Sequence, residues 1–234
     1  MTGKDTQQHA AFEAVLGHTF TDKNILIQAL THRSYVNENR ETSVGHNERL
    51  EFLGDAVLEL IVTRALYDRF PDNPEGDLTA YRSALVNSDT LAAVAVELKI
   101  SDYLRLSRGE AKDTGRGRTY ILANATEAII GAVYLDGGYE KAQALIAAVI
   151  LPKLDLIIAN KSWIDAKSMF QAKAQELSGS TPSYRTIRES GPDHDKQFTV
   201  GVYIAETLVA QGEGKSKQDA EQAAARKGIE VKGW

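Results

Sequence analysis

The chain has 234 residues and a formal charge of −5, with 43% hydrophobic and 25% charged residues, a composition typical of folded globular proteins with one or two domains. It contains no cysteine, which excludes disulfides and thiolate metal sites. No run of about 18 apolar residues occurs, and residues 1–5 lead into polar residues without the apolar core of a signal peptide. We therefore expect neither a membrane span nor a signal peptide, and a cytoplasmic location.

The negative charge is confined to residues 1–164. Residues 165–234 contain ten Lys or Arg and ten Asp or Glu, so the excess comes from the 17 basic and 22 acidic residues before them. An acidic segment that approaches a polyanionic partner needs cations at the contact. The charge distribution therefore indicates metal ions in the first part of the chain.

Up to residue 158, apolar residues recur at the three- and four-residue spacing of helices. The breaks in this pattern contain the helix-breaking residues Pro71, Pro74 and Gly76, then residues 109–117, then residues 136–138. The sequence therefore predicts an all-α domain over residues 1–158, with helices at 10–16, 23–30, 48–66, 78–98, 119–135 and 139–158.

Residues 159–164 are expected to form a linker, in which Trp163 is a docking residue rather than a functional one. After it the pattern changes to a helix, three alternating strands and an Ala-rich helix, with a Gly-x-Gly turn before the last helix. The sequence thus predicts a small α+β domain of order α-β-β-β-α over residues 165–234, with elements at 166–178, 184–188, 198–204, 207–211 and 217–229.

Three acidic residues stand out in the segment 46–58. Glu48, Glu51 and Asp55 are spaced i, i+3 and i+7, so they project from one side of a helix. Their neighbours are strongly apolar, which predicts a buried helix. Because clustered carboxylates repel one another and are costly to desolvate, a divalent cation is the natural compensation, and oxygen-only ligands favour magnesium or manganese.

The alternative interpretation is that these acids form structural salt bridges with Arg49, Arg64 or Arg82. The glycine at position 54 favours the metal-site hypothesis over this one. A glycine inside a helix costs roughly 1 kcal/mol relative to alanine and often marks the close approach of another group.

A second polar pair lies in the later helix. Asn124 and Glu127 are spaced i and i+3 and are flanked by apolar residues. Two helices that each bring oxygen atoms from a buried face can close an oxygen-lined metal site.

The segment 47–58 closely resembles the signature of the ribonuclease III family. The resemblance extends along the chain, through residues 31–34, 70–71, 75–77, 85–87 and 134–138. It implies a magnesium-dependent endoribonuclease that cuts double-stranded RNA, with manganese as a substitute ion, and a homodimer with one active site per subunit. It also implies products with 5′-phosphate and 3′-hydroxyl ends, short 3′ overhangs, and a role in ribosomal and messenger RNA processing.

The same resemblance implies the roles of individual acidic residues. Asp55 and Glu127 match catalytic positions, and the metal ligands are expected to be Glu51, Asp55, Asn124 and Glu127. Glu48 and Glu75 match supporting acidic positions. Because no Ser, Cys or His occupies the place of a covalent nucleophile, water is the expected attacking group.

One residue departs from the family pattern. Many members carry Asp where this chain has Asn124, and Asn offers a carbonyl oxygen without a charge, so a weaker second-metal affinity is expected. This departure also favours the rival hypothesis, a non-catalytic binder of double-stranded RNA, although the intact Glu51, Asp55 and Glu127 favour the enzyme.

Residues 165–231 resemble a double-stranded RNA-binding domain, chiefly through the segment 212–225. Lys215 and Lys217 are expected near a helix N-terminus, where phosphate binding is favoured, and two glycines would let the backbone approach the RNA. Such domains recognise the shape of about 16 base pairs. The expected RNA-binding residues are Gln171, Gln175, His194, Lys215, Ser216 and Lys217.

Several conspicuous residues receive plainer assignments. His32 to Ser34 are expected to start a helix, with Arg33 a possible phosphate contact, and Glu59 is expected to be solvated or paired with Arg64. The segment 108–118 is either a basic RNA contact or a solvated loop. A phosphohydrolase acting on small nucleotides, suggested by His194 and Asp195, would leave the second domain unexplained.

Overall fold

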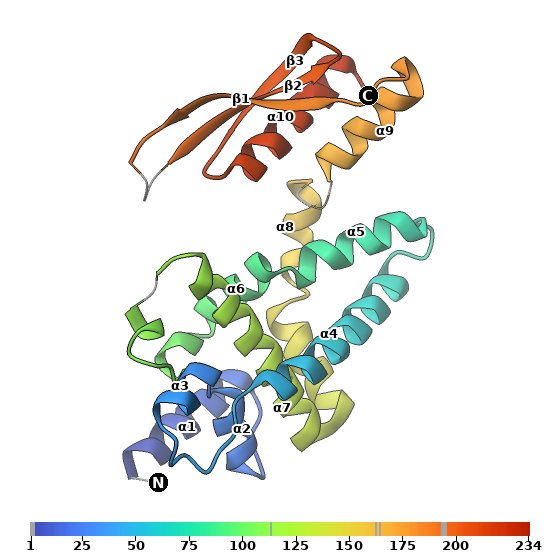
Figure 1. The fold of residues 1–234 in the computed structure, drawn as a ribbon. Helices are drawn as coiled ribbons and strands as arrows, with labels where there is room; N and C mark the ends of the chain where they lie inside the picture. The colour runs from blue at the N-terminus through green and yellow to red at the C-terminus, as the bar shows by residue number, and fades with distance from the viewer. Residues whose placement is uncertain (1–2, 113, 162, 164, 193–195) are drawn as a thin grey trace. The chain divides into compact units, whose positions relative to one another are not determined.

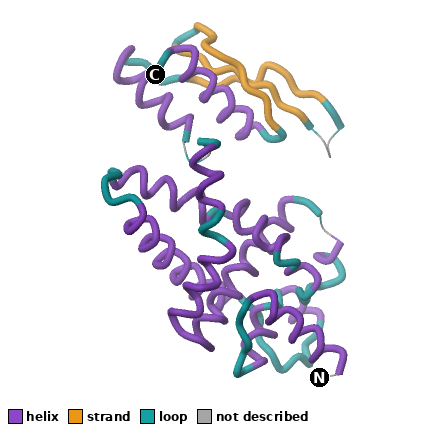
Figure 2. The backbone as a smooth tube through the Cα atoms, turned by 180° about the vertical axis from the view of Figure 1, so that it is seen from behind, coloured by secondary structure: helices purple, strands orange, loops and turns teal. Residues whose placement is uncertain are grey.

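The computed structural model describes residues 3–112, 114–161, 163, 165–192 and 196–234. The chain divides into two compact units, Met1–Trp163 and Ile164–Trp234, which are described separately. The first unit is built from helices and the second from a three-stranded sheet with two helices (Figure 1, Figure 2). Both the all-α class of the first part and the α-β-β-β-α order of the second are confirmed.

The first unit contains α-helices that range in length from 6 to 34 residues (Figure 1). Its elements are α1 Gly3–Leu16, α2 Lys23–Ala29, α3 Arg33–Glu38, α4 Glu48–Arg69, α5 Glu75–Val86, α6 Ser88–Glu97, the 3₁₀ turns η1 Ile100–Asp102 and η2 Glu110–Lys112, α7 Arg116–Val149 and α8 Lys153–Ala159.

Two helices predicted from the sequence are wrong in their extent. The segment 78–98 is divided at Asn87, which follows the last residue of α5. Its side-chain amide donates a hydrogen bond to the carbonyl oxygen of Ala84 in α5, and its side-chain oxygen caps α6 by accepting a hydrogen bond from the backbone N–H of Thr90. The predicted helix 139–158 ends at Val149 and resumes at Lys153, beyond Pro152. The expected break at residues 136–138 is a kink within α7, where Gly138 has a φ of 77°.

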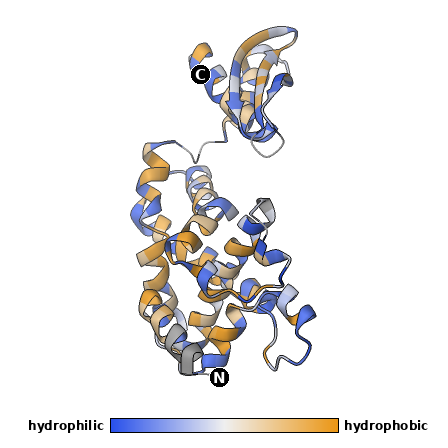
Figure 3. Cartoon of the chain, turned by 90° about the vertical axis from the view of Figure 1, so that its left-hand side faces the viewer, coloured by the Kyte–Doolittle hydropathy of each residue, from blue (hydrophilic) through white to orange (hydrophobic). Residues whose placement is uncertain are grey.

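The core of the first unit lies around the crossing of α4 and α7. Leu58, Ile61 and Leu66 of α4 are buried with Ile129 and Ile130 of α7. Figure 3 shows hydrophobic residues distributed over the helices of the first unit. Within the described residues no single helix is long and apolar enough to cross a membrane, and only a bent pair, Gly117–Val149 with Lys153–Ala159, meets that test by length and composition.

Trp163 lies at the end of the first unit and packs edge-on against Tyr81, with 4.8 Å between the ring centroids. This contact agrees with its expected docking role. The linker predicted over residues 159–164 includes Ser162 and Ile164, which lie outside the described residues, and α8 extends to Ala159.

The second unit is an antiparallel sheet of order β1-β2-β3 with two helices packed on it. Its elements are α9 Ala166–Ser178, β1 Ser183–Ser190, β2 Gln197–Ile204, β3 Thr207–Gly214 and α10 Lys217–Lys232. Phe170 of α9, Val202 of β2 and Ala224 and Ala225 of α10 form one buried cluster. The helices begin at capping side chains, Asp165 for α9 and Ser216 for α10.

The Gly-x-Gly segment differs from its predicted role. Gly212 and Gly214 are the last paired residues of β3, opposite Val200 and Phe198, and they do not form a turn. A Cβ atom on Gly212 would lie 2.1 Å from the backbone nitrogen of Ala224. The space beside these glycines is therefore filled by α10, and it is not available for an approach of their backbone to RNA.

Candidate active site

The acidic residues of α4 are positioned by a close helix crossing. A Cβ atom on Gly54 would lie 1.8 Å from the carbonyl oxygen of Glu127, and one on Gly131 would lie 2.2 Å from the carbonyl oxygen of Leu50. Only glycine at both positions lets the two backbones meet at this distance. The group whose approach was expected at Gly54 is thus the backbone of α7, and the crossing sets Glu127 beside Glu51 and Asp55.

Glu127 has the most perturbed ionisation in this cluster. Burial, followed by the negative charges of Asp55 and Glu51, raises the pKa of Glu127 to about 7. Carboxylates that share a site disfavour each other's ionised form. Near neutral pH, in the absence of a cation, Glu127 therefore holds a proton for a substantial fraction of the time.

Glu51 is influenced in the same direction. Burial and the charge of Glu48 raise the pKa of Glu51, a side-chain hydrogen bond from Asn124 opposes the rise, and the charge of Asp55 adds to it. Because a carboxylate can only accept, the amide group of Asn124 is the donor in this bond. Asn124 is thus linked to the acidic cluster by a hydrogen bond to Glu51.

The helix carrying these acids is less buried than its apolar sequence predicts. Phe52 is 81% exposed, and both Asp55 and Glu48 are exposed. Glu48 lies 3.4 Å from the guanidinium of Arg33 and 3.7 Å from Nδ1 of His46. One side of α4 is therefore open, and Arg33, considered a possible phosphate contact, faces Glu48.

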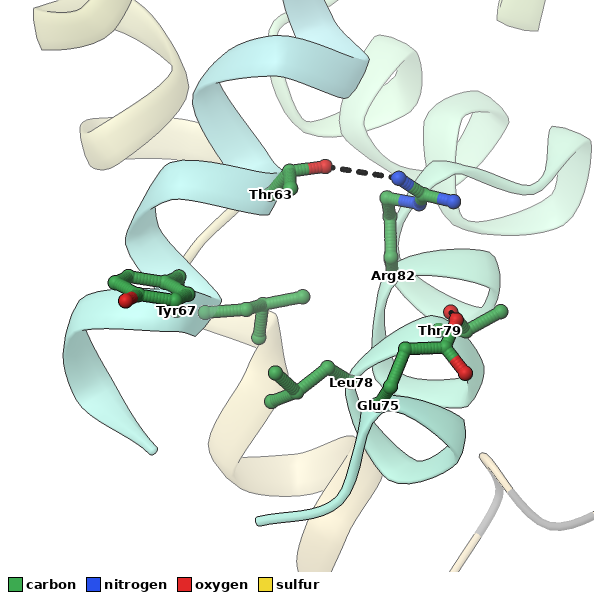
Figure 4. Close-up of a pocket in the computed structure, with 7 residues that line it drawn as sticks. Thr63, Tyr67, Glu75, Leu78, Thr79 and Arg82 are labelled. Atoms are coloured by element: carbon green, nitrogen blue, oxygen red, sulfur yellow. Dashed lines mark hydrogen bonds between the residues drawn. The ribbon is translucent and has the colours of Figure 1, made fainter. Parts of the chain in front are cut away.

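Glu75 lies in a different place from the cluster. It is at the start of α5, where it accepts a hydrogen bond of 2.9 Å from Oγ1 of Thr79. It lines a pocket of about 260 Å³ between α4 and α5 (Figure 4). The lining residues are Thr63, Leu66, Tyr67, Glu75, Leu78, Thr79 and Arg82, so this pocket does not contain the four expected metal ligands.

Two arginines considered as salt-bridge partners of the acidic triplet have other partners. Arg64 pairs with Asp68 at 2.7 Å. Arg82 lies 3.4 Å from Glu59 and donates a 3.0 Å hydrogen bond to Thr63, which Figure 4 shows across the pocket. The expected pairing of Glu59 with Arg64 is therefore wrong, because Arg82 of α5 reaches Glu59 instead.

The donor set fits a hard divalent cation in its chemistry. It consists of three carboxylates and one amide, all of which offer oxygen atoms. Burial, followed by the charges of neighbouring carboxylates, raises the pKa of Glu127 and of Glu51, and a cation would offset this cost of ionisation. As the side chains stand, no group of three or more His, Cys, Asp or Glu among the described residues is arranged to hold a metal ion. The side chains of the expected ligands are thus close enough to influence one another's ionisation, but they do not form a coordination shell.

Most of the residues expected to bind RNA in the second unit lie on α9 or at the start of α10. Gln171 and Gln175 are exposed on α9, and Gln175 lies 3.4 Å from the hydroxyl of Thr181. Ser216 caps α10 by accepting from the backbone N–H of Asp219. Lys215 is exposed, and His194 lies outside the described residues.

Lys217 has a partner that the sequence did not indicate. Its Nζ atom lies 2.9 Å from Oε1 of Glu189 on β1 and 5.7 Å from the centroid of the Phe198 ring. Glu189 and Lys217 are far apart in sequence and belong to different elements, so no spacing pattern could have shown this pair.

The segment 108–118 is anchored at its start. The backbone N–H groups of Ser107 and Arg108 donate 3.0 Å hydrogen bonds to Ser34 and Glu38. His32 caps α3 and bonds to Ser34, which confirms the expected helix start. The segment contains η2 and the first turn of α7, while Asp113 lies outside the described residues; an RNA contact there stays a prediction.

Comparison with known proteins gives matches along nearly the whole chain. A family model described as Ribonuclease-III-like matches residues 22–154, and one described as Double-stranded RNA binding motif matches residues 166–232. A Ribonuclease 3 of Geobacter sulfurreducens is 45% identical over 93% of this chain and 88% of that protein. One of Bdellovibrio bacteriovorus is 41% identical over 97% of each. The solved nuclease domain of a Campylobacter jejuni ribonuclease III is 42% identical, covers 59% of this chain and 93% of its own, and has a TM-score of 0.54.

Proposed function

Because the chain belongs to the ribonuclease III family and is a double-strand-specific endoribonuclease, we propose that it cuts by magnesium-assisted attack of water on the phosphodiester. The ends would be 5′-phosphate and 3′-hydroxyl, with short 3′ overhangs. Manganese would substitute for magnesium, since both ions prefer oxygen donors.

The observation that carries this proposal is the charge coupling at the α4–α7 crossing. Burial, together with the proximity of Asp55 and Glu51, raises the pKa of Glu127 to about 7. Glu51, Asp55, Asn124 and Glu127 would hold the cation, with Asp55 and Glu127 catalytic. When bound, magnesium would lower the pKa of the attacking water and stabilise the negative charge on the phosphate. Glu127 must release its proton before its carboxylate can serve as a ligand.

Two further acidic residues would play supporting parts. Glu48 raises the pKa of Glu51 by its charge and lies near Arg33 and His46, so it tunes the cluster from its exposed edge. Glu75 lines the pocket between α4 and α5, away from the four ligands.

The second unit would supply recognition of the duplex. Gln171 and Gln175 on one face of α9, His194, and Lys215, Ser216 and Lys217 at the start of α10 are the proposed contacts. Such domains read shape, phosphates and 2′-hydroxyls over about 16 base pairs with little base readout. This mode suits an enzyme that processes duplexes of varied sequence.

The active form is proposed to be a homodimer. Phe52 is 81% and Leu135 54% exposed, and both line a pocket with Leu50 and Leu53. Exposed apolar groups beside an apolar hollow are typical of protein interfaces. The solved nuclease domain of the Campylobacter jejuni ribonuclease III has a region involved in dimer formation. The proposed role is ribosomal and messenger RNA processing in the cytoplasm.

The test is digestion of long double-stranded RNA by the purified full chain, with magnesium and with EDTA. We expect shortening to small duplexes that requires magnesium and is abolished by Glu127→Gln. Glu140→Gln, on the same helix beyond the kink at Gly138, is the matched control and should retain activity. Binding without cleavage in magnesium and in manganese would contradict the proposal and support a non-catalytic RNA binder.

A further inference from the structure

The start of α10 carries a cation that the protein itself partly neutralises. Nζ of Lys217 lies 2.9 Å from Oε1 of Glu189. Glu189 also faces Lys196, with 3.7 Å between Oε2 and the ammonium nitrogen. The hydrogen bond from Lys217 is the largest of the effects that lower the pKa of Glu189 below its ordinary value. The carboxylate is therefore ionised at neutral pH.

The carboxylate of Glu189 presents to Lys217 the same features as an RNA phosphate. Both are anionic groups whose oxygens accept charge-assisted hydrogen bonds from an ammonium. Lys217 remains 58% exposed at its side chain, and Glu189 37%, so RNA can reach the pair. A phosphate that approaches Lys217 would meet one negative charge beside the positive one.

We propose that Glu189 is an affinity-determining residue that competes with RNA phosphate for Lys217. The inference rests on the proposed recognition of RNA by Lys217. By occupying the ammonium group, Glu189 weakens duplex binding and reduces the number of counterions released on binding. The second unit, which has equal numbers of acidic and basic residues, would thereby bind moderately and release cleaved duplexes readily.

The expected size of the effect follows from Coulomb's law. Two like charges about 4 Å apart in water repel each other enough to change a dissociation constant about fivefold. Since salt screens this repulsion, the effect should be largest at low ionic strength. Glu189→Gln removes the charge and retains an oxygen that can accept from Lys217, so it separates the charge effect from loss of the hydrogen bond.

The test is binding of the full chain to a duplex of about 20 base pairs, measured by fluorescence anisotropy in EDTA over a range of KCl concentrations. Glu189→Gln should lower the dissociation constant about three- to fivefold at low salt and steepen its salt dependence by up to about one counterion. Glu206→Gln is the matched control, because Glu206 also pairs with a cation of the sheet, Arg185, at 2.9 Å; it should change affinity less than twofold.

A second background tests whether Glu189 acts through Lys217. In a Lys217→Met chain, Glu189→Gln should have no more effect than Glu206→Gln. The inference would be overturned if Glu189→Gln increased the affinity for RNA equally with and without Lys217. It would also be overturned if Glu189→Gln alone left the affinity unchanged or lowered it. In either case, the proposed function would stand as long as the wild-type chain binds the duplex. Failure of the wild-type chain to bind duplex RNA would overturn both.

Discussion

Gly54 of α4 and Gly131 of α7 face each other at the point where the two helices cross. A Cβ atom on Gly131 would lie 3.0 Å from the backbone nitrogen of Gly54 and closer still to the carbonyl oxygen of Leu50. Asp55 directly follows Gly54, and Glu127 lies one helical turn before Gly131. This glycine pair therefore fixes the spacing between the two proposed catalytic acids.

Gly54→Ala should therefore reduce both stability and activity. The added methyl group meets α7 backbone at 1.8 Å, and the helices must separate, with a cost of roughly 1–3 kcal/mol or more. Thermal unfolding and RNA cleavage measure the two effects. Gly76→Ala is the control, because a Cβ there meets nothing within 4 Å; it should be neutral or slightly stabilising. A Gly54→Ala chain as stable as wild type would contradict the crossing geometry.

Glu127→Gln should stabilise the metal-free protein at high pH. Burial and the charges of Asp55 and Glu51 raise the pKa of Glu127 from 4.5 to about 7 in the folded state. The stability that this group confers is thus fully present below about pH 4.5 and is lost as the pH rises through 7. In EDTA at pH 8 the free energy of unfolding of Glu127→Gln should exceed that of the wild-type chain by roughly 1–3 kcal/mol. At pH 5 the difference should be much smaller.

Thermal unfolding at the two pH values measures this difference. Glu140→Gln should show no such dependence, because Glu140 is exposed. Magnesium should stabilise the wild-type chain more than Glu127→Gln, since a ligand that binds the folded state adds to its stability. An equal gain of Glu127→Gln at pH 5 and pH 8 would argue against the coupling of Glu127 to its neighbours.

Asp136 should be a source of stability that acid removes. It accepts hydrogen bonds from the backbone N–H groups of Thr21 and Asp22 and from Nε2 of His18. Burial opposes ionisation, but these bonds prevail and hold the pKa of Asp136 below 3.8. Its contribution is present above the unfolded-state pKa and is lost as the pH falls through the folded-state value.

Asp136→Asn should then destabilise the protein by roughly 1–3 kcal/mol at pH 7, and the difference from wild type should shrink below about pH 4. Urea unfolding at pH 7 and at pH 3 measures it. Asp155→Asn serves as the control, because Asp155 is 69% exposed and pairs with Arg69 at the surface, where such pairs contribute roughly 0–1 kcal/mol. A destabilisation of Asp136→Asn that is the same at both pH values would contradict the prediction.

Local patterns in the sequence predicted most of the helices and strands, because an element with one buried face has apolar residues at regular spacing. The sequence did not place the break at Asn87, since a single capping side chain ends one helix and begins the next. It also misassigned the Gly-x-Gly segment as a turn. The sequence alone cannot distinguish a glycine in a turn from a strand glycine that makes room for a packed helix. Gly54 indicated a close approach, but only the fold identifies α7 as its partner.

The proposed site shows the same division. The i, i+3 and i+7 spacing brings Glu48, Glu51 and Asp55 to one side of α4, yet spacing alone cannot say which of them is coupled to Glu127 across the crossing. Contacts between distant elements, such as Lys217 with Glu189, leave no trace in spacing. The sequence therefore predicted which residue types form the site, and the fold determines their ionisation.

Asn124→Asp should change the metal requirement of cleavage. The Asn124 amide donates to Glu51 and so lowers the pKa of Glu51 against the effect of burial; an ionised Asp cannot donate and adds a charge to the cluster. The metal-free variant should be less stable at pH 8, while a bound cation gains about 1 kcal/mol or more from the extra charge. Half-maximal cleavage should then need several-fold less magnesium. Asn160→Asp, at the end of α8, controls for net charge, and a magnesium titration of Asn124→Asp that matches wild type would show that the amide is not a determinant of cation affinity.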